Sequence, residues 1–142
     1  MTLTLLSPRA LLLGALIASP ALCPSQLHAA DRLTVGLYEG TATVNGKDQP
    51  FTHCFTAAEA KNVNADAKTG RQYAEEASKG VCNVTAYDIT GATISMTVVC
   101  GKSVTTTVGT YHGDAFESEA TRKVGDSVLV IHTKAKRVGA CK

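Results

Sequence analysis

The sequence has few bulky aromatic residues: it contains no Trp, three Phe and four Tyr among 142 residues. We therefore expect a thin core, with an inner face made mostly of small aliphatic side chains. The sequence also lacks an excess of one charge, because 14 basic residues stand against 12 acidic ones. Near-neutrality argues against a nucleic-acid partner, which needs a basic surface that neutralises phosphates.

Motifs for common cofactor chemistry are absent as well. The sequence has no Cys-x-x-Cys redox pair, no glycine-rich phosphate loop and no zinc-ligand spacing. His53, His112 and Asp114 are the best candidates for metal ligands, but a turn already explains Asp and Gly in the 112–114 segment. We therefore predict neither a metal nor a cofactor.

Nucleophilic and acid–base chemistry is also poorly represented. His53-Cys54 is the only adjacent pair of a base and a nucleophile, and a catalytic Cys has to be a free thiolate. Glu117 and Glu119 lie two residues apart on an expected strand, so they share one face, which we expect to face solvent. His132 lies within another expected strand, where a structural role explains it. We predict that the protein is not an enzyme.

The first thirty residues have the layout of a secretory signal peptide. A short apolar run, ALLLGALIA at 10–18, follows Arg9 and is ended by Pro20. The run is too short to span a bilayer as a helix, and small residues follow at 29 and 30. We expect cleavage of residues 1–30, which leaves one periplasmic domain over residues 31–142 without a stable membrane span.

Two alternatives concern the end of this leader. Cleavage after Ala21 fits the preference for small residues better than cleavage after Ala29 or Ala30, but it would leave Cys23 in the product. The second alternative is that Cys23 is a lipid-attachment cysteine. Leu22, however, stands where lipoprotein signals usually have a small residue, so we disfavour lipidation.

Four cysteines remain after removal of the leader: Cys54, Cys82, Cys100 and Cys141. An even number in a small exported chain predicts two disulfides, formed in an oxidising compartment. Residues 82–100 read as two strands around a turn at Thr90-Gly91. A register centred on Gly91 opposes apolar residues in three pairs: Ala86–Met96, Val84–Val98 and Cys82–Cys100. This register predicts a Cys82–Cys100 disulfide and leaves Cys54 for Cys141.

Further strands are expected on both sides of this hairpin. Residues 33–44 and 47–55 form a hairpin around Asn45-Gly46, and Pro50 places the second of these strands at a sheet edge. Later strands are expected over 104–111, 116–122 and 127–136. In the first of these we expect an inner face of Val104, Thr106 and Val108. The cluster of Lys134, Lys136 and Arg137 suits an edge strand that resists aggregation.

Two short helical segments interrupt the strands. Thr56 and Glu59 fit a capping box, which predicts a short helix over 57–65. Residues 68–70 (Lys-Thr-Gly) read as a turn, followed by one helical turn over 73–78. The whole pattern predicts a mainly β fold, an antiparallel meander of about seven strands. It forms a curled sheet, a sandwich or a partial barrel, with one or two short helices and two disulfides.

Several short motifs are spread over residues 33–141: GLYEGT (36–41), HCFTAAEA (53–60), YHGDAF (111–116) and AKRVGAC (135–141), together with Cys82 and Cys100. In this combination the chain resembles a family of small exported proteobacterial proteins that is known only as a domain of unknown function. Tyr38 stands where we expect Trp in that family. The resemblance implies a periplasmic, β-rich domain with no established activity.

These observations favour a non-enzymatic binding or structural protein of the cell envelope, monomeric and with an unidentified protein or envelope partner. One alternative is an inhibitor of a secreted hydrolase such as a lysozyme, which would present a rigid loop. The candidate loop is Tyr111, His112, Gly113 and Asp114, or alternatively the turn at Thr90-Gly91. A second alternative is a carrier of a small apolar ligand inside a half-closed barrel.

Overall fold

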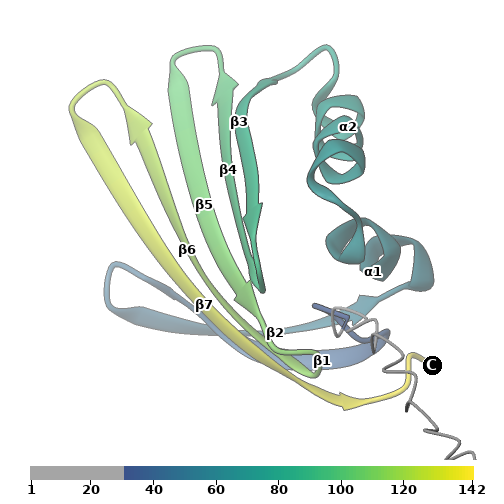
Figure 1. The fold of residues 1–142 in the computed structure, drawn as a ribbon. Helices are drawn as coiled ribbons and strands as arrows, with labels where there is room; N and C mark the ends of the chain where they lie inside the picture. Colours follow the sequence, from purple (N-terminus) through teal and green to yellow (C-terminus); the bar gives the residue numbers. More distant parts are fainter. Residues whose placement is uncertain (1–30) are drawn as a thin grey trace, which may run out of the picture.

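The computed structural model describes residues 31–142, so the predicted signal peptide and Cys23 lie outside the described residues. Seven strands form one antiparallel sheet that stays open, and two helices lie between the second and third strands (Figure 1). The elements are β1 (Gly36–Val44), β2 (Lys47–Phe55), α1 (Ala57–Asn64), α2 (Ala67–Ser78), β3 (Asn83–Thr90), β4 (Thr93–Cys100), β5 (Ser103–Tyr111), β6 (Ala115–Val124) and β7 (Ser127–Gly139). The predicted mainly β, antiparallel fold is confirmed, and it takes the form of the curled sheet.

The strand order is β2-β1-β7-β6-β5-β4-β3, so the first hairpin pairs with the last strand. Strand β2, which contains Pro50, lies at one edge, as the proline predicted. Strand β7 is central, because it pairs with both β1 and β6. The prediction that Lys134, Lys136 and Arg137 protect a sheet edge is therefore wrong. The β1–β7 pairing joins opposite ends of the domain, which a local charge pattern does not reveal.

Both helices lie on the concave side of the curved sheet (Figure 1). The capping box of α1 is present: Glu59 N–H donates to Thr56 Oγ1 at 3.3 Å, and Thr56 N–H donates to Glu59 Oε2 at 2.8 Å. Helix α2 begins after Asp66, whose Oδ1 accepts from Thr69 N–H at 2.9 Å. The predicted turn over 68–70 is wrong, because this cap starts a helix that runs on through Gly70.

The hairpin of β3 and β4 contains a β-bulge that changes its register. The observed partners are Val84–Val98, Ala86–Thr97, Tyr87–Met96 and Thr90–Thr93. Thr85 is the extra residue, and beyond it every partner shifts by one position, so the turn residues are Gly91 and Ala92. The predicted pair of Ala86 and Met96 is therefore wrong. The bulge turns Tyr87 toward the face that carries Met96.

The inner face of β5 also differs from the prediction. Val104 and Val108 are 39% and 42% exposed and lie on the convex face, so the expected inner face of Val104, Thr106 and Val108 is wrong. Thr107 and Gly109 lie toward the helices instead. Alternating Val and Thr suit either face of a strand, so the pairing with β4 decides the orientation.

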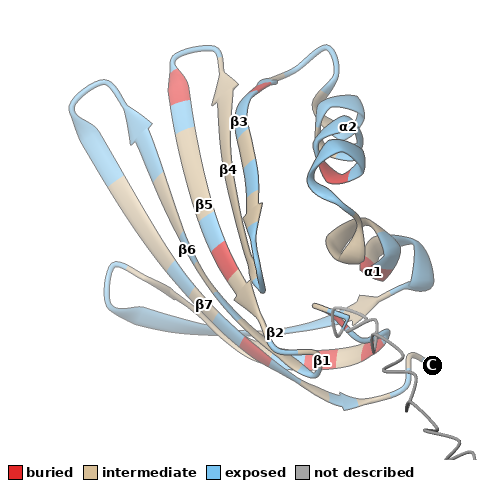
Figure 2. Ribbon diagram, in the orientation of Figure 1, coloured by how far each residue is buried: buried red, intermediate tan, exposed pale blue. Residues whose placement is uncertain are grey.

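The hydrophobic core is small and lies at one end of the sheet. Its buried members are Leu33, Tyr38 and Ala135. Tyr38 is completely buried, and its ring centroid lies 5.1 Å from that of Phe55 in an edge-to-face arrangement. Phe51, Tyr111 and Phe116 also pack against this cluster, so the expectation that small aliphatic side chains dominate the interior is wrong here. Figure 2 shows how few positions of the sheet are buried. The rest of the concave face is therefore not filled by protein side chains to the density of an ordinary core.

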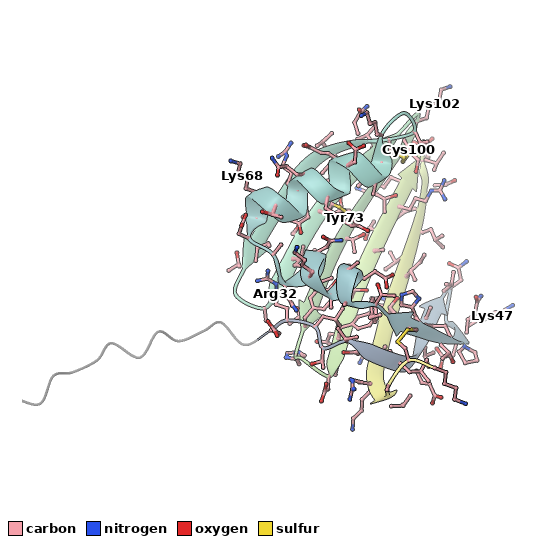
Figure 3. The ribbon with its side chains drawn as sticks, turned by 90° about the vertical axis from the view of Figure 1, so that its right-hand side faces the viewer. Arg32, Lys47, Lys68, Tyr73, Cys100 and Lys102 are labelled. Atoms are coloured by element: carbon pink, nitrogen blue, oxygen red, sulfur yellow. A yellow bond between two sulfur atoms is a disulfide. The ribbon has the colours of Figure 1, made fainter. Side chains whose placement is uncertain are left out.

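The two disulfides join Cys82 to Cys100 and Cys54 to Cys141, with Cα–Cα distances of 4.3 and 5.6 Å. This pairing is the one that the strand register predicted. The first closes the open end of the β3–β4 hairpin just after α2 ends, near the labelled Cys100 in Figure 3. The second ties β2 to the segment that follows β7.

Candidate functional site

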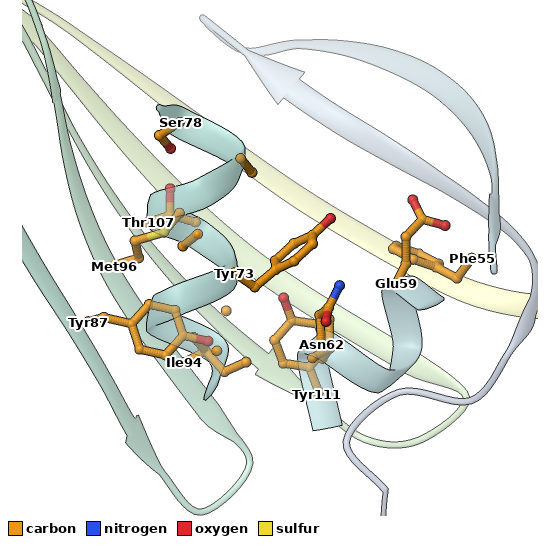
Figure 4. Close-up of a pocket in the computed structure, with 15 residues that line it drawn as sticks. Phe55, Glu59, Asn62, Tyr73, Ser78, Tyr87, Ile94, Met96, Thr107 and Tyr111 are labelled. Carbon is orange, nitrogen blue, oxygen red and sulfur yellow. The ribbon is translucent and has the colours of Figure 1, made fainter. Parts of the chain in front are cut away.

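A cavity of about 370 Å³ lies between the two helices and the concave face of the sheet (Figure 4). Side chains from β3, β4 and β5 form its floor, and the helices and the end of β2 form its roof and side. The main lining residues are Phe55, Val63, Tyr73, Ala74, Tyr87, Ile94, Met96, Thr107 and Tyr111, with Glu59 and Asn62 on the α1 side. The lining is therefore largely apolar and aromatic.

The space exists because small residues face each other across it. Helix α2 presents Gly70, Ala74 and Ala77 to the cavity, and β5 presents Thr107 and Gly109. Bulkier aliphatic residues at these positions would close the gap, as interdigitated side chains do in ordinary cores. The cavity is thus a consequence of the amino-acid sequence on two facing elements.

Gly70 sets how closely α2 approaches the sheet. A β-carbon at this position would overlap the Tyr87 hydroxyl and lie 2.9 Å from its Cζ. Tyr73, one turn further along, is 49% exposed, and Ala77 is exposed as well. The helix therefore touches the sheet near Gly70, and the cavity opens to solvent beside the later turns of α2.

The segment before β1 fastens the helices to the sheet. The Arg32 guanidinium donates to three carbonyl oxygens: Val63 at 2.7 Å, Gly91 at 3.4 Å, and Ala65. Val63 belongs to the last turn of α1, where orphan carbonyls favour a cation, and Gly91 belongs to the β3–β4 turn. One side chain thus connects the α1–α2 junction to the far hairpin.

Asn64 makes a second fastening to the same segment. Leu33 N–H donates to Asn64 Oδ1 at 2.8 Å, and Asn64 Nδ2 donates to the Leu33 carbonyl at 2.9 Å. The amide therefore satisfies both backbone groups of a residue whose side chain is buried in the core. These two bonds hold the end of α1 at a defined position above the sheet.

Two tyrosine hydroxyls provide the polar groups on the cavity floor. Burial raises the pKa of Tyr111, the neighbouring Tyr87 raises it further, and the Arg32 charge opposes both effects. Burial also raises the pKa of Tyr87, again opposed by Arg32. Both phenols are therefore neutral hydrogen-bond donors at physiological pH.

The carboxylate beside the cavity is already engaged in local structure. Hydrogen bonds from the Thr56 backbone and hydroxyl lower the pKa of Glu59, and His53 lowers it further. His53 Nε2 lies 3.1 Å from Glu59 Oε1. Glu59 is consequently held as an anion by its helix cap.

The predicted binding loop is divided between two roles. Tyr111 lines the cavity, whereas Gly113 pairs with the segment before β1: Thr34 N–H donates to the Gly113 carbonyl at 2.9 Å, and Gly113 N–H donates to the Arg32 carbonyl at 3.0 Å. The Tyr38 hydroxyl donates to the Gly113 carbonyl at 2.8 Å.

His112 and Asp114 complete this turn. Asp114 accepts through its carbonyl from Arg137 N–H at 2.7 Å, and the His112 N–H donates to the Ala115 carbonyl at 2.8 Å. The turn is thereby built into the end of the sheet. Presentation of the loop to a protein partner stays a prediction.

The remaining candidates do not come together. Cys54 is in a disulfide, so it is no thiolate nucleophile. Glu117 and Glu119 lie on the convex face, both exposed, and Glu119 Oε2 lies 3.5 Å from His132 Nδ1. Over residues 31–142 there is no group of three or more His, Cys, Asp or Glu side chains arranged to hold a metal ion.

Sequence reasoning missed most of the cavity residues. The predicted pair of Ala86 and Met96 places Tyr87 on the face opposite to Met96. The structure puts both on one face because of the bulge at Thr85, which leaves no clear signal in the sequence. A signal was available in α2, where Gly70, Ala74 and Ala77 recur at helical spacing and form a face of small residues. Such a face permits close approach or leaves space, and the facing element decides which.

Within the described part of the chain, no helix has the length and apolar character needed to cross a membrane. No curated protein and no solved structure matches the chain. The family model described as "Protein of unknown function (DUF3617)" matches residues 33–141, which include every strand, both helices and all four paired cysteines. The chain therefore belongs to the DUF3617 family.

Proposed function

We propose that the protein is an exported, non-enzymatic binding protein that carries a small apolar ligand in the cavity beneath α2. The observation that carries this proposal is the unfilled apolar space between the helices and the sheet. Its volume of about 370 Å³ falls in the range of ligand sites, roughly 300–1,000 Å³. Protein interiors otherwise contain few voids larger than a water molecule.

The cavity has the chemistry of such a site. Apolar side chains such as Ile94 and Met96 supply contact area, and Met adapts its shape to irregular ligands. The hydroxyls of Tyr87 and Tyr111 supply a small number of directional donors. A mostly apolar lining with few polar groups is typical of small-molecule sites.

Export to the periplasm is the second part of the proposal. It is supported by the leader-like residues 1–30 and by two disulfides, which persist in oxidising compartments. The binding role, as opposed to catalysis, is supported by the position of Glu59. This carboxylate of the lining accepts hydrogen bonds from the Thr56 N–H and hydroxyl in the cap of α1.

The test is a fluorescence titration with N-phenyl-1-naphthylamine, a dye whose emission rises in apolar sites. We expect saturable binding to the oxidised protein. Thr107→Phe fills the cavity from its floor, so it should reduce the dye affinity at least tenfold. The matched control is Thr106→Phe, one residue away on the convex face, which should bind dye as the parent protein does.

The fold of each variant is checked by its thermal unfolding midpoint. If the parent protein shows no saturable dye binding, or if the Thr107 and Thr106 variants bind dye equally, the cavity is not a ligand site. If the dye binds as expected, native mass spectrometry of protein purified from periplasm identifies the natural ligand by its added mass.

A further inference from the structure

The apolar floor of the cavity continues across the sheet beyond the helices. A row of successive cross-strand partners runs over β4, β5, β6, β7 and β1: Met96, Thr107, Ala120, Ile131 and Val44. Cross-strand partners share a face, and Met96 and Thr107 line the cavity, so the whole row lies on the concave face. We call this row, with its neighbour Leu129, the trough.

No helix covers the far part of the trough among the described residues. The cavity floor takes its strand residues from β3, β4 and β5, and α2 contacts β3. Figure 1 shows α2 beside β3, away from the upper parts of β6 and β7, and α1 at the lower end of the sheet. Ala120, Leu129 and Ile131 are only half-buried. The apolar strip is therefore longer than the cavity.

Acidic side chains of the strands lie on one face only, whereas basic side chains lie on both faces. The strand carboxylates all lie on the convex face: Glu39, Asp48, Asp88, Glu117 and Glu119. The strand cations of the concave face are Lys47, Arg122 and Arg137. Two of these lie beside the trough, because Lys47 pairs with Val44 and Arg122 pairs with Leu129.

We propose that the ligand is a single-chain amphiphile with a long acyl or alkyl tail and an anionic head group. The inference rests on the proposed function of the cavity. The tail occupies the cavity and the trough, and the head lies beside Lys47 at the uncovered β1 end (Figure 3 labels Lys47). Four strand spacings separate β4 from β1, about 19 Å in all, so the trough matches an extended long chain.

The position of the charges sets the orientation. Glu59 is the charged residue of the cavity lining, so an anionic head there would be repelled. Lys47, opposite Val44, lies at the end of the trough away from Glu59. Arg122 flanks the trough partway along it, where its Nε donates to Ser103 Oγ at 2.9 Å. Guanidinium and ammonium groups both bind carboxylate and phosphate.

The first test measures displacement of N-phenyl-1-naphthylamine by saturated fatty acids from decanoate to hexadecanoate, each below its micellar concentration. Full burial of a methylene changes affinity about fourfold. Because the trough is open on one side, we expect about twofold per methylene, so hexadecanoate should bind roughly 60-fold more tightly than decanoate. Equal affinities would overturn the inference.

The second test places a polar group in the trough. Ile131→Asn should weaken hexadecanoate at least tenfold and leave decanoate and the dye unchanged. Val130→Asn, the next residue on the convex face, is the matched control. If Ile131→Asn lowers the unfolding midpoint strongly, Ala120→Asp on β6 replaces it. If a trough variant binds hexadecanoate as tightly as its control does, the acyl tail does not lie in the trough.

The third test concerns the head group. Hexadecanoate and hexadecyl phosphate should both displace the dye better than hexadecanol, and hexadecyltrimethylammonium should be weakest. Lys47→Gln should remove most of this preference, whereas Lys123→Gln on the convex face should keep it. Equal displacement by all four head groups would overturn the anionic assignment. Failure of the dye itself to bind the parent protein would instead refute the proposed function.

Discussion

Gly70 on α2 lies directly against the hydroxyl end of Tyr87 on β3, at the closest approach of helix and sheet. In an exposed helix Gly70→Ala would add about 1 kcal/mol of stability. Here the new methyl overlaps the phenol, so we predict a net loss of about 1–3 kcal/mol by overpacking. Urea unfolding measures this difference.

A double-mutant cycle identifies the cause of that loss. Tyr87→Phe removes the nearest overlapping atom, so Gly70→Ala should be less destabilising in the Tyr87→Phe background. Gly139→Ala is the control, because a β-carbon there meets no atom within 4 Å. Additive effects of the two substitutions would show that the contact does not limit the packing of α2.

The Asn64 side chain should behave as a two-part clamp. Asn64→Ala leaves both the Leu33 N–H and carbonyl without their partner, and we predict a loss of about 2 kcal/mol in the free energy of unfolding. Asn64→Asp keeps the acceptor and loses the donor to the Leu33 carbonyl, so it should be intermediate at pH 7. The clamp is refuted if Asn64→Ala unfolds at the parental urea midpoint.

Removal of the two disulfides should have unequal effects. They close loops with sequence separations of 87 and 18 residues. In the chain-entropy model, replacing Cys54 and Cys141 by Ser lowers the free energy of unfolding by about 4.6 kcal/mol. Replacing Cys82 and Cys100 by Ser lowers it by about 3.2 kcal/mol. Thermal unfolding of the two double variants tests this order. The reverse order would mean that strain or native contacts outweigh loop entropy.

The cap of α1 should contribute to the loss of stability of the protein as the pH falls into the acidic range. The folded-state pKa of Glu59 lies below its ordinary value of 4.5, so its contribution is present above that pH and is lost as pH falls through the folded-state pKa. Glu59→Gln keeps the capping geometry without this titration. Its unfolding midpoint should therefore fall less steeply than that of the parent protein between about pH 5 and 3.

A companion variant measures the cap itself. Thr56→Ala should cost about 1 kcal/mol at pH 7, because Glu59 N–H loses its acceptor. Parallel acid-unfolding curves for the parent protein and Glu59→Gln would show that the Glu59 carboxylate does not contribute through its charge.

The parts of the fold that were predictable have short-range causes. Asn45-Gly46 requires positive φ at both residues, and the structure has φ values of 51° and 74° there. The capping box of Thr56 and Glu59 is complete within four residues. The Cys82–Cys100 pair was predicted correctly although the bulge at Thr85 was missed. The bulge lies between the disulfide and the turn, so it leaves the Val84–Val98 pair in place.

The parts that were missed depend on partners distant in the sequence. The central position of β7 follows from its pairing with β1. The inner face of β5 follows from its pairing with β4, since its alternating Val and Thr suit either face. The helical state of 68–70 follows from the Asp66 cap and from the contact of Gly70 with Tyr87.

By itself, the sequence determined the antiparallel β class, the number of strands, the disulfide pairing and the thinness of the core, because turns, period-two alternation and composition act locally. Only the tertiary structure decided where the missing core volume lies. It places the small residues of α2 opposite Thr107 and Gly109, and it lines up Met96, Ala120 and Ile131 in one row. A cavity is a relation between surfaces that meet only after folding, and no local pattern encodes that meeting.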